Sequence, residues 1–134
     1  MNHWSVQYIG LPWAAYGQGP DEFDCWAFVR HVQRIHFGRD LPIIDVDAND
    51  RAAVCLAFAT NQERQRWMRV DTPQEGDCVL VYKGAVADHV GMWLELDGGK
   101  VLHAVPRMGV VSTSVRALQR LGWNPIEFYR FAGV

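Results

Sequence analysis

The sequence predicts an α+β fold in which helices near the N-terminus pack on one side of an antiparallel sheet. Two helical patterns come first, at about residues 25–37 and 50–66, and five short β-type runs follow after Trp67. The turn Asp97-Gly98-Gly99 joins two of these runs as a tight hairpin, which makes them antiparallel neighbours. Helices first and strands afterwards is the order typical of this fold class.

The composition is that of an ordinary globular protein, and we expect one domain over residues 1–134. Hydrophobic residues make up 49% and charged residues 21% of the chain, which is enough to bury a core. The net charge is −2 and the basic residues are scattered, so we expect neither a nucleic-acid nor a membrane partner. The first residues, Met1-Asn2-His3-Trp4, lack the charged and apolar regions of a secretion signal. This predicts a protein made and kept in a cytoplasm unless it leaves as part of something larger.

The first helix has recognisable ends. Glycine and proline punctuate the first 24 residues, which we expect to be loop. Asp24 is suited to cap a helix over Cys25–Phe37, and Gly38 to stop it. One apolar stripe at the three-and-four spacing runs along this helix: Phe28, Val29, Val32 and Ile35. The second helix, over residues 50–66, follows a loop that starts at Leu41.

The second half of the chain predicts a sheet of five to six strands. The β-type runs are residues 78–82, 89–96, 100–105, 110–115 and 126–131. A turn over residues 72–77 precedes the first run, and a short helix near residues 116–121 precedes the last.

The cysteines differ in their surroundings. Three are present, without a Cys-x-x-Cys pair, which argues against a disulfide framework and a zinc knuckle. Cys55 and Cys78 lie in apolar runs, where a thiol is usually a small buried hydrophobe. Cys25 is the first residue of the predicted helix, where the helix dipole and free N–H groups stabilise a thiolate and can hold an oxyanion. Cys25 is therefore the candidate nucleophile.

A nucleophilic cysteine needs a base, and histidine titrates in the right range. His31 and His36 lie on the same helix as Cys25, six and eleven residues later, and cannot reach its sulfur. His89 and His103 remain, on two neighbouring predicted strands. Gly91 shares the face of His89 and leaves room there for a substrate.

The register of the hairpin decides whether the two histidines meet. A three-residue loop pairs Leu96 with Lys100 and puts both histidines on one face, whereas a two-residue loop puts them on opposite faces. Even the three-residue loop places His103 opposite Trp93, about 13 Å along the strand from His89. Strong twist or a bulge is needed to close that gap, so His89 is the better-supported base.

Five segments contain sequence motifs that occur together in one known family. They are Tyr8-Ile9-Gly10-Leu11-Pro12-Trp13, residues 17–29 with Asp24-Cys25-Trp26-Ala27-Phe28-Val29 at their end, Glu75-Gly76-Asp77-Cys78-Val79-Leu80, His89-Val90-Gly91-Met92-Trp93-Leu94 and Val101-Leu102-His103-Ala104. In this order they resemble the opening segment and the Asp-Cys-Ser/Trp-Gly-(Leu/Phe)-Val, Gly-Asp-Leu-Val, His-Val-Gly-Ile-Tyr-Leu and Ile-His-Ala motifs of the NlpC-type cysteine peptidases. That papain-like family consists of cell-wall hydrolases.

The resemblance implies a papain-like fold and a set of roles. Cys25 would be the nucleophile, His89 the general base and acid, and His103 the orienting third residue. The reaction implied is cleavage of γ-D-glutamyl–diamino-acid bonds in peptidoglycan stem peptides, without a cofactor or a metal. The substrate-binding candidates are Asp24, Trp26, Trp13, Tyr16 and Gly91. Asp24 matches a family aspartate that holds the amino terminus of substrates in some members, and helix capping is its other reading.

Some residues depart from the family pattern. Trp26 stands where secreted members have serine, Ala27 where most have glycine, and Trp13 where tyrosine is usual, so the stem-peptide specificity does not carry over directly. The Asp24-Cys25-Trp26 motif, together with the expected lack of a secretion signal and of a wall-binding domain, makes the sequence similar to the family branch encoded by tailed phages and prophages. That similarity implies synthesis in a host cytoplasm, a place in the virion tail and tail-tip protein partners.

Other functions fit the same residues. The chain can be a structural tail-assembly protein with a vestigial site, and its tryptophans can line an interface. A Cys–His amidase or acyltransferase would share the nucleophile and the base. Cys25, His89 and His103 can also be read as zinc ligands.

Overall fold

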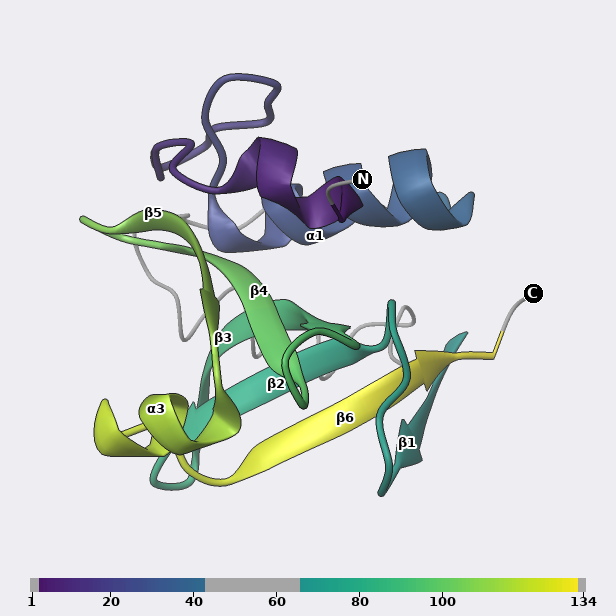
Figure 1. The fold of residues 1–134 in the computed structure, drawn as a ribbon, viewed down its shortest axis with the longest axis vertical. Coiled ribbons are helices and arrows are strands. Elements are labelled where there is room, and N and C mark those ends of the chain that lie inside the picture. Colours follow the sequence, from purple (N-terminus) through teal and green to yellow (C-terminus); the bar gives the residue numbers. More distant parts are fainter. Residues whose placement is uncertain (1–2, 43–65, 133–134) are drawn as a thin grey trace.

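In the computed structural model, residues 3–42 and 66–132 of the 134-residue chain are described (Figure 1). The predicted helix over residues 50–66 and Cys55 therefore lie outside the described residues, apart from Arg66. The elements in chain order are η1 (Trp4–Tyr8), α1 (Cys25–Phe37), β1 (Trp67–Val70), β2 (Cys78–Lys83), β3 (Val86–Leu94), β4 (Lys100–Val105), β5 (Gly109–Thr113), α3 (Val115–Arg120) and β6 (Ile126–Phe131).

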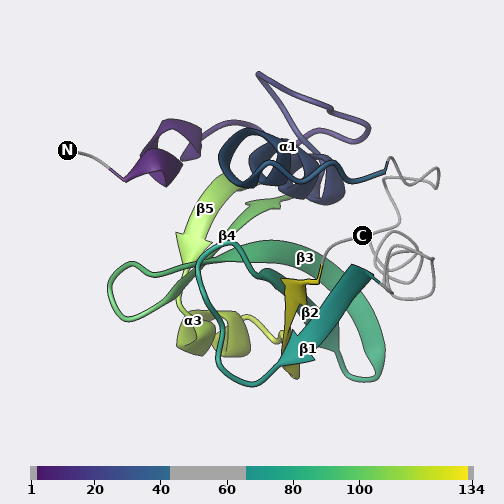
Figure 2. The ribbon, with the colours of Figure 1, turned by 90° about the vertical axis from the view of Figure 1, so that its right-hand side faces the viewer.

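The six strands form one antiparallel sheet in the order β1-β6-β2-β3-β4-β5. The predicted α+β class is confirmed, and α1 packs against β3 and β4 as expected of an N-terminal helix. Figure 2 shows α1 on one side of the sheet and α3 on the other. Because side chains alternate along each strand, the sheet separates two apolar clusters. One includes the inner face of α1, and the other includes Leu118 of α3.

Helix α1 begins and ends where its sequence predicts. The Asp24 side chain accepts a hydrogen bond from the Ala27 amide at 2.8 Å, and Gly38 ends the helix with φ 67°. Ile35 was predicted in the buried stripe, but 53% of it is exposed. Gln33 is fully buried instead, because its amide donates to the Gly76 carbonyl at 2.8 Å and this hydrogen bond offsets the cost of burying the polar group.

The hairpin between β3 and β4 corrects the predicted register. Leu94, not Leu96, pairs with Lys100. Residues 97–99 all have positive φ, so the chain cannot stay extended there, and the Gly99 amide closes a turn onto the Leu96 carbonyl at 2.8 Å. Leu96 is thereby removed from the strand.

Other boundaries also differ from the sequence prediction. The edge strand β1 and the short helix η1 were not predicted, and β3 starts three residues early, at Val86. Strand β5 ends at Thr113 rather than at Val115, because the Ser114 hydroxyl accepts from the Ala117 amide at 3.1 Å and starts α3. The segment before α1 pairs with the start of β5 through Gly10 and Leu11.

Candidate active site

Cys25 is the first residue of α1 and is 2% exposed. Its cluster in the core includes Val90 and Ala104, which directly follow His89 and His103 in the sequence. Burial raises the pKa of the neighbouring Asp24, against the lowering effect of the amide hydrogen bonds that this carboxylate accepts as helix cap. The predicted position of the thiol at a capped helix start is confirmed.

His89 and His103 are joined by a hydrogen bond of 2.8 Å between Nε2 of the former and Nδ1 of the latter. The predicted separation of about 13 Å was wrong, because it rested on the wrong register. The observed register pairs Trp93 with Val101 and Met92 with Leu102, so His103 comes beside Gly91 instead of Trp93. Residues diagonal to each other on one face of an antiparallel pair are within reach of long side chains.

Gly91 is what allows this approach. A Cβ atom there would lie 2.9 Å from Cβ of His103 and 2.8 Å from Cγ1 of Val101. The space beside His89 is therefore filled by side chains of β4. The sequence predicts room for a substrate there, and the close packing of β4 against Gly91 leaves none.

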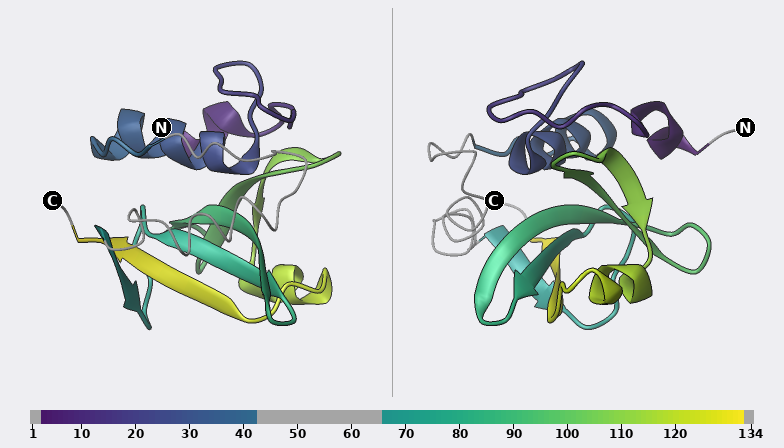
Figure 3. Two further views of the ribbon diagram at one scale, coloured as in Figure 1. Left: turned by 180° about the vertical axis from the view of Figure 1, so that it is seen from behind. Right: turned by 90° about the vertical axis from the view of Figure 1, so that its left-hand side faces the viewer.

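The two histidines lie just beyond the end of the hydrogen-bonded ladder between β3 and β4. The ladder between these strands ends at Met92 and Leu102, although both strands continue beyond it. Strand β3 is strongly curved (Figure 3), and a bulge opposite Val81 and Tyr82 interrupts its pairing with β2 just before His89. His89 itself pairs with Val81 of β2, directly after this bulge.

Trp123 holds the ring of His89. The two rings stack at 5.2 Å with an angle of 12° between their planes, and Trp123 meets His103 edge-on at 5.8 Å. The indole N–H donates to Oδ2 of Asp88 at 2.7 Å, which fixes the orientation of the tryptophan. Trp123 is one of the tryptophans for which the sequence suggested an interface, and no local sequence pattern links the turn after α3 to β3.

The imidazole of His103 has a second partner on the next strand. Its Nε2 lies 2.9 Å from Oγ1 of Thr113 in β5. Burial lowers the pKa of His103 to about 4, so the ring is neutral at neutral pH. Sequence reasoning missed Thr113, because only the register of β4 against β5 brings it to the site.

The thiol and the ring that stacks on His89 belong to different apolar clusters. Cys25 belongs to the cluster beneath α1, whereas Trp123, which stacks on His89, belongs to the cluster beneath α3. A direct contact between the sulfur and His89 stays a prediction. The side chains of Cys25, His89 and His103 are all buried, with 1–2% of each residue exposed.

The other substrate-binding candidates are spread around the start of α1. The Trp26 indole is buried and donates to the Pro42 carbonyl at 2.9 Å. Trp13 is half-buried and forms a bridge with Phe23, whereas Tyr16 is 59% exposed with φ 65°. Tyr16 is thus the most accessible of these candidates.

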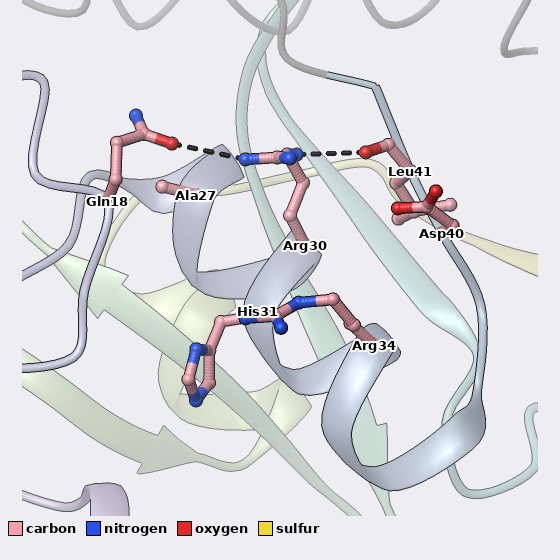
Figure 4. Close-up of a pocket in the computed structure, with 7 residues that line it drawn as sticks. All are labelled: Gln18, Ala27, Arg30, His31, Arg34, Asp40 and Leu41. Atoms are coloured by element: carbon pink, nitrogen blue, oxygen red, sulfur yellow. Dashed lines mark hydrogen bonds between the residues drawn. The ribbon is translucent and has the colours of Figure 1, made fainter.

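A hollow on the outer side of α1 contains none of the predicted catalytic residues (Figure 4). Arg30 crosses it, donating to Oε1 of Gln18 at 3.1 Å and to the Leu41 carbonyl at 3.0 Å. The residues that line it are Gln18, Ala27, Arg30, His31, Arg34, Asp40 and Leu41.

Within residues 3–42 and 66–132, no three histidine, cysteine or acidic side chains are arranged to hold a metal ion, so the zinc reading gains no support. In the same part of the chain, none of the helices has the length and apolar character needed to cross a bilayer.

A cysteine that starts a helix, and a hydrogen-bonded histidine pair on the sheet which that helix covers, define the papain-like α+β class. The family model described as NlpC/P60 family matches residues 10–126, and the chain belongs to this family. This confirms the family resemblance found in the sequence. None of the curated proteins compared with the chain matches it.

Two solved structures show similar folds. The NlpC/p60 domain of the peptidoglycan hydrolase SagA is 25% identical with a TM-score of 0.58, over 92% of this chain and 91% of that one. A Staphylococcus aureus protein described as similar to lipoprotein, NLP/P60 family, is 21% identical with a TM-score of 0.53. The match covers 92% of this chain and 38% of the staphylococcal chain. At 21% identity it shows a shared fold.

Proposed function

We propose that the protein is a cysteine peptidase that hydrolyses peptide bonds in the stem peptides of bacterial peptidoglycan. The observation that carries this proposal is the bond between His89 and His103 on the strands covered by the helix that begins with Cys25. Membership of the NlpC/P60 family supports it, as does similarity to a domain of a peptidoglycan hydrolase.

Each residue has a defined step in the reaction. His89 removes the proton of Cys25, and the thiolate adds to the substrate carbonyl carbon. The start of α1 supplies amide donors and the positive end of the helix dipole for the oxyanion. When the C–N bond breaks, His89 returns the proton to the departing amine and a thioester remains. Water, deprotonated by His89, then releases the acid and the free thiol.

Digestion of purified peptidoglycan tests the proposal. We expect new amino groups, and mass spectrometry of the muropeptides identifies the bond. Cys25→Ala abolishes the release, whereas Cys78→Ala, at a buried cysteine of β2, keeps it. Unchanged turnover in the Cys25→Ala protein rules the mechanism out.

The pairing of Cys25 with His89 has its own test. A thiolate, not a thiol, reacts with iodoacetamide, so a histidine partner speeds alkylation below pH 7. We expect His89→Ala to slow the alkylation of Cys25 there by about tenfold or more, as the thiol pKa returns toward its ordinary value. Equal rates in both proteins show that the two residues do not interact.

The finer assignment is that the bond cut is the γ-D-glutamyl–diamino-acid bond. We also propose that the protein is made in a host cytoplasm and carried with tail-tip proteins in a virion tail. The Asp24-Cys25-Trp26 motif supports the proposal that the chain belongs to the phage-encoded branch of the family. Mass spectrometry of virions from a phage encoding the chain tests this placement, and its absence from the tail counts against it.

A structural tail-assembly role with a vestigial site is the second candidate function. The burial of Cys25, His89 and His103 favours it, because an active site has to admit its substrate. No alkylation of Cys25 in the native protein, together with a requirement for particle assembly, would support this role. An amidase or acyltransferase using the same pair differs in its muropeptide products.

A further inference from the structure

Three side chains on three adjacent strands form one hydrogen-bonded line. His89 of β3 bonds to His103 of β4 at 2.8 Å, and His103 bonds to Thr113 of β5 at 2.9 Å. His103 pairs directly with Val111, so Thr113 is two residues from the direct partner. His89 is likewise two residues from Gly91, the neighbour of His103. The same diagonal step thus brings each ring to its partner on one face of the sheet.

The hydrogen atoms of these two hydrogen bonds can be arranged in only two ways. A neutral imidazole has one nitrogen that donates and one that accepts. If His89 donates, His103 accepts at Nδ1 and donates from Nε2 to Thr113. If Thr113 donates, both rings reverse, and the remaining proton of His89 sits on Nδ1, which then cannot act as a base.

Catalysis selects the first direction. Once His89 has taken the thiol proton it is an imidazolium, and both of its nitrogens donate. His103 must then accept at Nδ1, so its own proton must be on Nε2. We propose that Thr113 is a positioning residue that accepts this proton in a hydrogen bond and thereby holds His103 in the tautomer that serves His89; this inference rests on the proposed function.

The surroundings of His103 support the need for this acceptor. The residue is 1% exposed, so solvent water does not reach its Nε2, and the edge-on ring of Trp123 covers another side. Burial also keeps the ring neutral, because it lowers the pKa to about 4. Without the hydroxyl, the buried Nε2–H loses its acceptor, and the proton is better placed on Nδ1, facing His89.

Two substitutions at Thr113 separate its hydroxyl from its shape. Thr113→Val replaces the hydroxyl with a methyl group, and Thr113→Ser keeps the hydroxyl. We expect Thr113→Val to lower kcat about 10- to 100-fold with KM little changed, as for other groups that orient a histidine through its second nitrogen. Thr113→Ser should restore activity close to that of the unsubstituted protein. Ser112→Ala is the matched control, because Ser112 is the exposed neighbour on the same strand.

Nitrogen-15 NMR reads the tautomer without reference to activity. In the unsubstituted protein, long-range proton–nitrogen correlations of His103 should show the proton on Nε2. In Thr113→Val we expect a substantial population with the proton on Nδ1, and in Thr113→Ser and Ser112→Ala none.

Either of two results overturns the inference: His103 carrying its proton on Nδ1 in the unsubstituted protein, or Thr113→Val leaving tautomer and kcat unchanged. If Thr113→Val does not fold, the tautomer in the unsubstituted and Thr113→Ser proteins decides the matter. If the unsubstituted protein cuts no peptidoglycan, the proposed function fails, and the NMR comparison alone supports or overturns the role of Thr113.

Discussion

Gly91→Ala is the sharpest perturbation of the candidate site. The added Cβ would lie 2.8 Å from Cγ1 of Val101, 2.9 Å from Cβ of His103 and 2.9 Å from the Leu102 carbonyl oxygen. Ordinary carbon contacts need about 3.5–4.0 Å, so neighbours must move by roughly 0.7 Å or more. Two of the three atoms are a backbone oxygen and a Cβ, which no rotamer change can move aside. Strand β4 itself has to shift away from β3.

This shift has consequences for stability and for the site. Overpacking of a buried position costs about 1–3 kcal/mol, and the upper end applies where the backbone must move. For a chain of this length we expect the Tm to fall by about 10 °C. A shift of roughly 0.7 Å also lengthens the 2.8 Å bond between His89 and His103 beyond hydrogen-bond range, so hydrolysis should be lost.

Urea denaturation and muropeptide release measure the two effects. Gly98→Ala is the matched control, since its φ of 81° is strained for alanine but nothing lies within 4 Å. It should cost about 1 kcal/mol and leave activity intact. Adding Val101→Ala to Gly91→Ala removes one of the three clashes, and we expect a coupling of about 1 kcal/mol. If Gly91→Ala changes stability by less than about 0.5 kcal/mol and keeps activity, the described approach of β3 to β4 is wrong.

Three further predictions concern the surroundings of the site. Burial lowers the pKa of His103 to about 4, so between about pH 6.5 and pH 4 the unfolded chain binds a proton that the folded chain does not. The free energy of unfolding, measured by urea denaturation, should therefore fall by about 3 kcal/mol as the pH is lowered through this range. His103→Gln should flatten this dependence, and an equally steep fall in that variant refutes the assignment. Trp123→Phe keeps a ring against His89 but loses the hydrogen bond to Asp88, so we expect the free energy of unfolding to fall by about 1 kcal/mol and hydrolysis to slow. Trp93→Phe is the control, since the buried indole nitrogen of Trp93 has no hydrogen-bond partner in the described part of the chain. Gln33→Leu removes the hydrogen bonds of the buried amide to the Gly76 carbonyl and to Arg39, which still donate and accept between themselves at 3.2 Å, so we expect a loss of about 1 kcal/mol in thermal unfolding. A neutral result shows that the bonds of Gln33 do not support the turn before β2.

Short-range features of the sequence were predicted well. The ends of α1 follow from Asp24 and Gly38, because capping and the left-handed stop involve residues within one turn of the helix. Runs of β-type residues located five of the six strands. The predicted family was confirmed by the match over residues 10–126. It could be predicted because its motifs are short segments of sequence in a fixed order.

Strand register could not be predicted. Three positive φ values at residues 97–99 close the hairpin early, and Glu95 leaves the ladder to donate its amide to Glu75. Nothing near Leu96 in the sequence shows that this distant carboxylate competes for the strand. Strand β1 was missed because its partner β6 lies at the other end of the sheet-forming region.

The candidates follow from the amino-acid sequence alone: a cysteine at a helix start, two strand histidines and the family to which such a set belongs. The folded chain adds that His89 and His103 bond to each other and that Gly91 makes this possible. It also shows that Thr113 and Trp123 complete their surroundings. This difference arises because helix ends depend on neighbours in the chain. Contacts across a sheet depend on register, which turns and distant hydrogen bonds set together.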